Sequence, residues 1–233
     1  MTNVLFIHHS VGRYLIAGGQ LRRRLREQSE TNAVNLWDVD YKKLGAHGPD
    51  GEAADIGIDI PEDNTDPDGF LRLLTAAKHA AVRERITAFD AVIHKACYPA
   101  SNLRDEGVLA ERIVLYRALL DACVNLPTFF VLATPPPLTP LRTSRAAAQN
   151  AMTFATWFAD VERPANVDVF DLHRVLRSDG GRYPGALSPN YRPLAPWDSH
   201  PNNRGRNAGA AALAVALAPV ARRSNGMSQD PQA

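Results

Sequence analysis

Short apolar runs recur along the chain, and each is bounded by polar or turn-forming residues. Runs of this length are typical of strands that are buried in a parallel sheet. The pattern predicts five strands, at residues 4–7, 34–39, 91–93, 128–133 and 167–170.

Longer stretches with a helical repeat separate most of these runs. They predict helices at residues 15–27, 70–88, 108–124, 143–161 and 205–221. Strands that alternate with helices imply right-handed crossovers, so the sheet should be mainly parallel and covered on both faces. We therefore predict an α/β fold, a three-layer α/β/α sandwich around a five-stranded, mainly parallel sheet. A single domain should span residues 1–222, with a disordered tail at 223–233, which is polar and lacks periodicity.

In such sheets, sites form beyond the carboxyl ends of the strands. Ser10 follows the first predicted strand, and Gly12 allows a tight turn after it. A serine hydroxyl needs a base to act as a nucleophile, and His200 is the candidate, with Asp198 two residues before it to orient the ring. Each feature also has an ordinary structural interpretation, since a serine at a strand end often caps a helix. A second Asp-x-His pair, Asp171–His173, shows that the spacing also arises elsewhere.

Taken in order, these segments resemble the SGNH (GDSL-like) hydrolase superfamily. The resemblance runs from about residue 3 to 221 and rests on FIHHSVG, CYPASN and DSHPNN, which contain Ser10, Asn102 and His200. It implies a flavodoxin-like SGNH fold and a serine nucleophile with histidine as base. It also implies an oxyanion hole formed by Ser10, a glycine after the second strand and Asn102. Gly45 in YKKLGAHG is the glycine that fits best, with Gly48 as the alternative.

The segments depart from the usual family pattern. His8–His9–Ser10 stands where Gly-Asp-Ser is usual, and Asp198 is two residues before His200 instead of three. The site is therefore either a Ser-His-Asp triad or a Ser-His dyad. The chain resembles a divergent bacterial branch of the superfamily, which has an acidic loop like the one at residues 63–70.

The resemblance implies a serine esterase or acyl hydrolase that acts on an ester or acyl group of a small molecule or saccharide. Two alternatives stay open, namely acyl transfer by the same site and ligand binding without catalysis. His9 and Lys95 are candidates for substrate contact, and Cys97 is a rival nucleophile after the third strand.

Metal and cofactor sites have little support in the sequence. His8 and His9 are neighbours in a strand and point to opposite faces, so we expect no metal site there. Residues 64–69 match the first half of a calcium loop, but the twelfth position is Thr75 instead of glutamate, so an acidic turn is the simpler interpretation. Glycine-rich nucleotide motifs are absent, and we expect no cofactor.

Composition narrows the classes of partner. The chain of 233 residues has a formal net charge of +1, which argues against nucleic acid as a partner. No apolar run approaches the about 20 residues that span a bilayer, and two cysteines fit a reducing compartment. We expect a cytoplasmic protein without a membrane partner. The long segment at 42–69 is the candidate for substrate selection, because long loops in compact domains are often functional.

Overall fold

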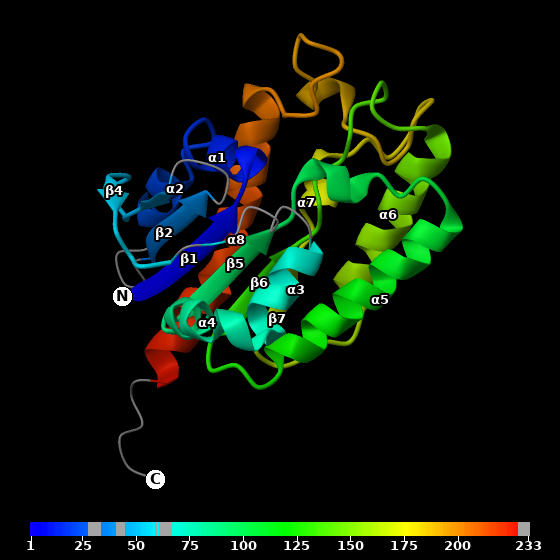
Figure 1. Cartoon of the computed structure of the whole chain (residues 1–233). Coiled ribbons are helices and arrows are strands. Elements are labelled where there is room, and N and C mark those ends of the chain that lie inside the picture. The colour runs from blue at the N-terminus through cyan, green and yellow to red at the C-terminus, as the bar shows by residue number, and fades with distance from the viewer. Residues whose placement is uncertain (28–33, 41–44, 59, 61–66, 228–233) are drawn as a thin grey trace.

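The structure is a computed structural model that describes the chain except for residues 28–33, 41–44, 59, 61–66 and 228–233 (Figure 1). Of residues 222–227 only the backbone is described. The first half of the candidate calcium loop (64–66) and the first half of the acidic loop (63–66) therefore lie outside the described residues, whereas residues 67–70 form the start of α3 (Pro67–Thr75).

A single sheet forms the centre of the molecule, with the strand order β4-β3-β2-β1-β5-β6-β7 (Figure 1). Five of its strands run parallel to their neighbours, in the order β2-β1-β5-β6-β7. They are β1 (Thr2–His8), β2 (Val34–Asp40), β5 (Ala91–Lys95), β6 (Phe129–Ala133) and β7 (Val167–Phe170). All five overlap the predicted strands. The apolar runs of β1, β5 and β6 are typical of strands buried on both faces, whereas β2 and β7 include the polar residues Asn35, Asp38 and Asp168.

The sheet has seven strands, so the prediction of five is wrong by two. The additional strands are β3 (Gly45–His47) and β4 (Ala53–Ala54), which extend the sheet antiparallel beyond β2. They lie in the segment 42–69, which we interpreted as a loop. They are too short for any alternation of polar and apolar residues to reveal them.

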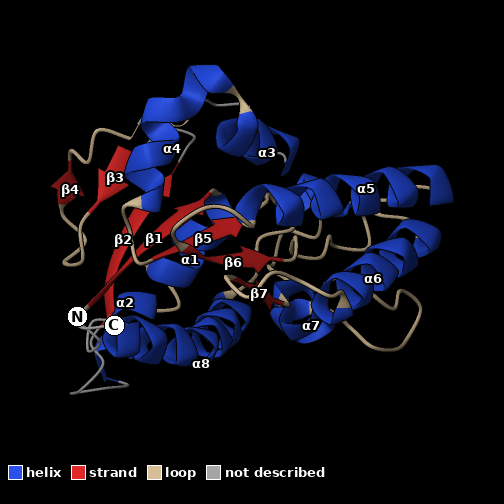
Figure 2. Ribbon diagram, turned by 90° about the horizontal axis from the view of Figure 1, so that it is seen from below, coloured by secondary structure: helices blue, strands red, loops and turns tan. Residues whose placement is uncertain are grey.

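Helices cover both faces of the sheet, as the alternating pattern predicts (Figure 2). One face packs against α1, α2, α7 and α8, and the other packs against α3, α4, α5 and α6. The helices are α1 (Ser10–Ile16), α2 (Leu21–Glu27), α3 (Pro67–Thr75), α4 (Ala80–Thr87), α5 (Glu106–Cys123), α6 (Arg145–Asp160), α7 (Leu172–Leu176) and α8 (Asn203–Met227).

Two of the predicted helices are each divided in the structure. The helix expected at 15–27 is interrupted after α1 by Gly18 and Gly19, and Gln20 has a φ of 56°, in the left-handed region. The helix expected at 70–88 is broken at Ala76, whose ψ of 135° is extended. The last helix, α8, continues to Met227 beyond the expected end at 221.

The core consists of two apolar layers, one on each face of the sheet. Tyr116, Phe154 and Phe158 form a cluster of edge-to-face and stacked rings between α5 and α6. Such pairs stabilise the packing by about 0.5–1.5 kcal/mol beyond their buried area. None of the described helices combines the length and apolar character needed to cross a membrane.

The order of the sheet reverses direction at β1, since β2 lies on one side of it and β5 on the other. A crevice forms outside the carboxyl ends of the strands at such a reversal, and ligands bind there in open α/β sheets. The residues after β1 and β5 are therefore the first to consider as a site.

Candidate active site

Three chemically capable side chains meet where β1 and β5 end. His9 Nδ1 lies 3.3 Å from Ser10 Oγ and 3.2 Å from Cys97 Sγ. Ser10 is the first residue of α1, where backbone N–H groups have no partner within the helix. We predicted Ser10, His9 and Cys97 as separate candidates, but not their contact. The contact could have been found from the topology, because His9–Ser10 follow β1 and Cys97 follows β5, and these two strands are neighbours in the sheet.

Gly12 allows α1 to pack closely on the end of β1. A Cβ atom at Gly12 would lie 2.3 Å from the Cβ of His8, closer than real Cβ atoms approach any other atom. Glycine at this position therefore holds Ser10 immediately above the sheet.

His200 and Asp198 form a second group just before α8. His200 Nδ1 lies 2.5 Å from Asp198 Oδ1, which also accepts a hydrogen bond from the His200 backbone N–H at 2.9 Å. The other ring nitrogen, Nε2, is buried and has no hydrogen-bond partner. The side chains of His200 and Asp198 are 21% and 36% exposed, so the pair is accessible from solvent.

Two tyrosines connect this pair to the Ser10 group. The ring of His200 lies edge-on to Tyr14 and to Tyr98, with ring centroids 5.1 and 5.4 Å apart. Tyr14 lies on α1 one turn after Ser10, and Tyr98 directly follows Cys97. The structure thus brings His200 against both segments of the Ser10 group, but no hydrogen bond joins Ser10 to His200.

The candidate oxyanion residues lie at the same end of the sheet. Gly45 has a φ of +70° and is paired with Asp40, which in turn is paired with His8. Asn102 follows the short helix η3 (Tyr98–Ser101), and its side chain is exposed. Neither residue is joined to Ser10 by a hydrogen bond among the described residues, so their role stays a prediction. Gly48, the alternative glycine, is buried and packs near Trp37.

A network of buried charges lies beneath α1. His8 Nε2 lies 2.9 Å from Asp38 Oδ2, and Arg22 pairs with the other oxygen of the same carboxylate. Burial alone would raise the pKa of Asp38, but the hydrogen bonds and charges of His8 and Arg22 lower it below its ordinary value of 3.8. Next to it, Arg13 of α1 donates a hydrogen bond to Asp40 at 2.8 Å. Both carboxylates are therefore anchors for the elements that carry Ser10.

Lys95 is fully buried at the end of β5, where its ammonium group donates to the carbonyl of Ala96 at 2.8 Å. Burial lowers its pKa to about 8, against the opposing influence of Cys97 and Asp40. A substrate therefore does not meet Lys95 at the surface of this structure.

The second Asp-x-His pair has a structural role. Asp171 caps α7 by accepting hydrogen bonds from the Arg174 backbone and from Thr134. His173 is buried with both ring nitrogens unpartnered, and burial lowers its pKa to about 3. Asp171 therefore does not orient His173, unlike Asp198 with His200.

No group of three or more metal-binding side chains is arranged around a common centre in the part of the chain that the structure describes. The histidines and carboxylates of the site act in pairs or with arginine.

Comparison with known proteins adds one likeness of fold. No family model matches the chain, and no curated protein matches it. Among solved structures, the chain resembles the lipase Lip_vut3 from a goat rumen metagenome, with a TM-score of 0.57 and 15% sequence identity. The alignment covers 93% of this chain and 97% of the lipase, so the two share an overall fold.

Proposed function

We propose that the protein is a serine hydrolase of the SGNH type that cleaves an ester or acyl group, with Ser10 as nucleophile and His200 as base. The observation that carries this proposal is the state of the His200 ring. Asp198 engages Nδ1, which leaves Nε2 buried and without a partner beside the helix that begins at Ser10. This is the arrangement that a base of a serine hydrolase requires.

In the reaction, Ser10 Oγ attacks the carbonyl carbon while His200 Nε2 takes its proton. The developing oxyanion accepts hydrogen bonds from the backbone N–H groups of Ser10 and Gly45 and from the side chain of Asn102. The alcohol leaves with the proton from His200, and an acyl-enzyme remains. Water then gives a proton to His200 and attacks the acyl carbon; the bond from that carbon to Ser10 Oγ breaks, His200 returns the proton to Ser10 Oγ, and the acid is released.

The likeness to a lipase supports this proposal at the level of the scaffold, since a fold of this kind serves ester hydrolysis in that protein. Asp198 contacts His200 but precedes it by two residues instead of the usual three, so the proposal includes both a triad with Asp198 and a Ser-His dyad. Transfer of the acyl group to an acceptor other than water uses the same steps and would appear as an acceptor-dependent product.

Binding without catalysis is the second candidate function. It is favoured by one observation, that Ser10 Oγ contacts His9 and not His200. Catalysis requires the Ser10 side chain or the segment before α8 to move so that Ser10 Oγ reaches His200 Nε2, since catalytic hydrogen bonds often form only when substrate is bound.

Labelling with a fluorophosphonate probe tests the proposal. We expect the folded protein to be labelled, the Ser10→Ala variant to be unlabelled, and Cys97→Ala to be labelled as the parent protein is. Loss of labelling in His200→Ala would identify the base. Folded protein that is not labelled, or labelling that persists in Ser10→Ala, would instead favour the binding function.

A further inference from the structure

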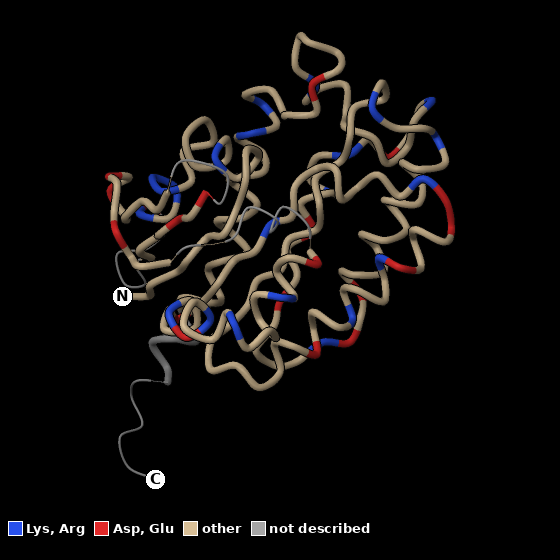
Figure 3. Tube along the Cα trace, viewed as in Figure 1, with Lys and Arg blue, Asp and Glu red and all other residues tan. Residues whose placement is uncertain are grey.

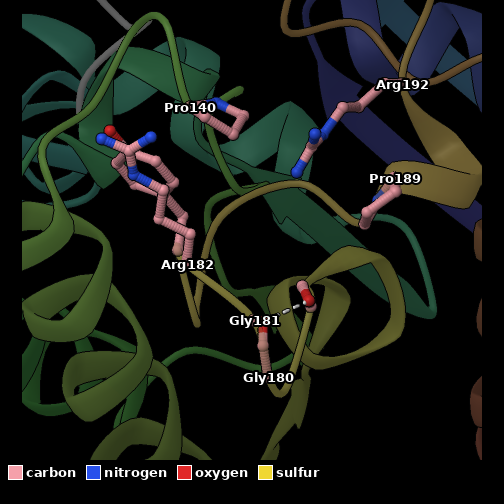
Figure 4. A pocket seen from close by; sticks show the side chains of 8 residues that line it. Pro140, Gly180, Gly181, Arg182, Pro189 and Arg192 are labelled. Carbon is pink, nitrogen blue, oxygen red and sulfur yellow. Dashed lines mark hydrogen bonds between the residues drawn. The ribbon is translucent and has the colours of Figure 1, made fainter.

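A pocket of about 490 Å³ opens at the carboxyl end of the sheet, apart from the residues assigned to the reaction (Figure 4). Its walls come from the segment after β6 and from the segment between α7 and α8. The residues that line it are Pro140, Ser178, Gly180, Gly181, Arg182, Tyr183, Pro189 and Arg192.

The only charged residues that line the pocket are two arginines. Arg182 and Arg192 approach it from opposite walls (Figure 4). The guanidinium of Arg182 lies 5.7 Å from the ring of Tyr183, and Arg192 Nε donates to the carbonyl of Leu187 at 3.0 Å. In the described part of the chain, no carboxylate pairs with either arginine.

Asp179, the acidic residue next to Gly180 in the sequence, is already engaged. Asp179 accepts a hydrogen bond from Arg177 Nε at 2.9 Å and does not line the pocket. The loops at this end of the sheet carry several basic residues (Figure 3). The pocket therefore has a positive charge that no protein group neutralises.

Glycines leave the floor of the pocket open. No atom lies within 4 Å of the position that a Cβ would occupy at Gly180 or Gly181. The backbone of this turn is fixed from below, because Ser178 Oγ donates to the Gly180 carbonyl at 2.9 Å (Figure 4). A ligand can thus approach the backbone here without displacing a side chain.

Hydrogen bonds tie the pocket to the segment that carries His200. Asn202 Nδ2 donates to the carbonyl of Arg192 at 3.0 Å, which fixes one wall. The backbone N–H of Thr139, next to Pro140, donates to Ser199 Oγ at 3.1 Å, which fixes the other wall. The pocket is therefore adjacent in structure to the proposed base.

We propose that this pocket binds an oxyanion group, a carboxylate or a phosphate, of the ester substrate. The assignment to a substrate rests on the proposed function, whereas anion binding by the pocket does not. Guanidinium groups suit such ligands because they donate two parallel hydrogen bonds to carboxylate or phosphate oxygens. The preferred substrates are then esters that carry a negative charge away from the scissile bond.

Kinetics with two esters of equal chain length test the proposal. 4-Nitrophenyl hydrogen adipate carries a carboxylate, and 4-nitrophenyl hexanoate does not. We expect Arg182→Gln and Arg192→Gln each to raise KM for the charged ester about tenfold, because each variant loses a charge-assisted hydrogen bond to the carboxylate. Each variant should change KM for the uncharged ester less than about twofold. Arg174→Gln, an exposed arginine of α7 outside the pocket, is the matched control and should leave both KM values unchanged.

Direct binding separates this proposal from the proposed function. Titration calorimetry with succinate and with inorganic phosphate should detect binding that weakens in both pocket variants and at high salt. The anion that binds with the higher affinity identifies the preferred group. No hydrogen bond joins the Arg182 side chain to another of the described residues, so its variant should remain folded. If neither ester is hydrolysed but an anion binds through the two arginines, the hydrolase proposal is wrong and the proposal of an anion-binding pocket is kept. Equal effects of the variants on both esters, or anion binding that is unchanged in the pocket variants, would contradict the anion-binding proposal.

Discussion

Two of the histidine–aspartate pairs, His8–Asp38 and His200–Asp198, have different surroundings. His8 and Asp38 are buried, and Arg22 pairs with the same carboxylate. His200 and Asp198 are half-buried, and no arginine pairs with Asp198 in the described part of the chain. The ring of His8 is engaged at both nitrogens, whereas His200 Nε2 has no partner.

The difference separates a structural role from a chemical one. A buried pair whose atoms are all engaged holds β1, β2 and α2 together, and it has no atom left to exchange a proton. The half-buried pair contributes less to folding, because solvent reaches it, and its Nε2 atom has no hydrogen-bond partner within the fold. The sequence cannot make this distinction, because His8 and Asp38 are 30 residues apart, and the Asp-x-His spacing of Asp198 and His200 does not reveal which atoms the ring contacts.

The largest expected effect is on catalysis. Replacing His200 by alanine should lower kcat for an ester substrate by about 10³–10⁴-fold, because the nucleophile loses its base. The free energy of unfolding should change by less than about 1 kcal/mol, as measured by urea denaturation. A variant that is fully active would show that His200 is not the base, and His9→Gln would then be the next variant to measure.

The buried pair should behave in the opposite way. Asp38→Asn leaves Arg22 without its carboxylate, and breaking a buried ion pair costs about 3–5 kcal/mol. Urea denaturation at neutral pH measures this loss. A change below about 1 kcal/mol would mean that the network does not stabilise the fold.

The pH dependence of stability extends the comparison to two other buried histidines, His94 and His173. Burial, the larger cause, and a neighbouring positive charge lower the pKa of His94 and of His173 from 6.5 to about 3. Both stay neutral in the folded protein while the unfolded chain takes up protons below pH 6.5. Stability should therefore be full above pH 6.5 and fall as the pH drops toward 3, by about 1.4 kcal/mol per pH unit for each histidine.

Urea denaturation across this range measures the slope. Replacing His173 by glutamine should reduce it, whatever the variant does to stability at pH 7. Asp38 contributes in a separate window, because its pKa is lowered from 3.8 and its stabilisation is lost only as the pH falls through that lower value. A slope that begins only below pH 4 would contradict the account of the two histidines.

The smallest expected effect on stability comes from Asp198. Asp198→Asn should change the free energy of unfolding by less than about 0.5 kcal/mol, the usual contribution of an exposed ion pair. The same variant decides between a triad and a dyad, since kcat falls by orders of magnitude only if the carboxylate orients His200. Asp38→Asn, measured in the same way, is the matched control for stability.

Much of the fold follows from local patterns in the sequence. The apolar runs at 4–7 and 128–133 lie within β1 and almost within β6, because strands buried on both faces leave no room for polar residues. The breaks and additions do not follow in this way. Ala76 interrupts a helical repeat without glycine or proline, and β4 consists of two alanines. Tertiary packing determines both.

The candidate site is predictable in kind but not in its contacts. Ser10 was identifiable because it follows a buried strand, and His200 because a carboxylate precedes it. The contact of His9 with Cys97 depends on which strands become neighbours, and the burial of Lys95 depends on tertiary packing. The pocket with Arg182 and Arg192 joins segments whose association no spacing reveals.

The short strand β4 has a consequence for how the protein behaves in concentrated solution. An outer strand offers unpaired backbone groups to which a strand of another molecule can add, which is a route to aggregation. At one edge of this sheet β4 presents only two residues, and at the other β7 presents four, with the charged Asp168 beside Arg163. Both edges are poor templates for an added strand. The antiparallel extension β3–β4 therefore also protects the folded protein from self-association through this edge of the sheet.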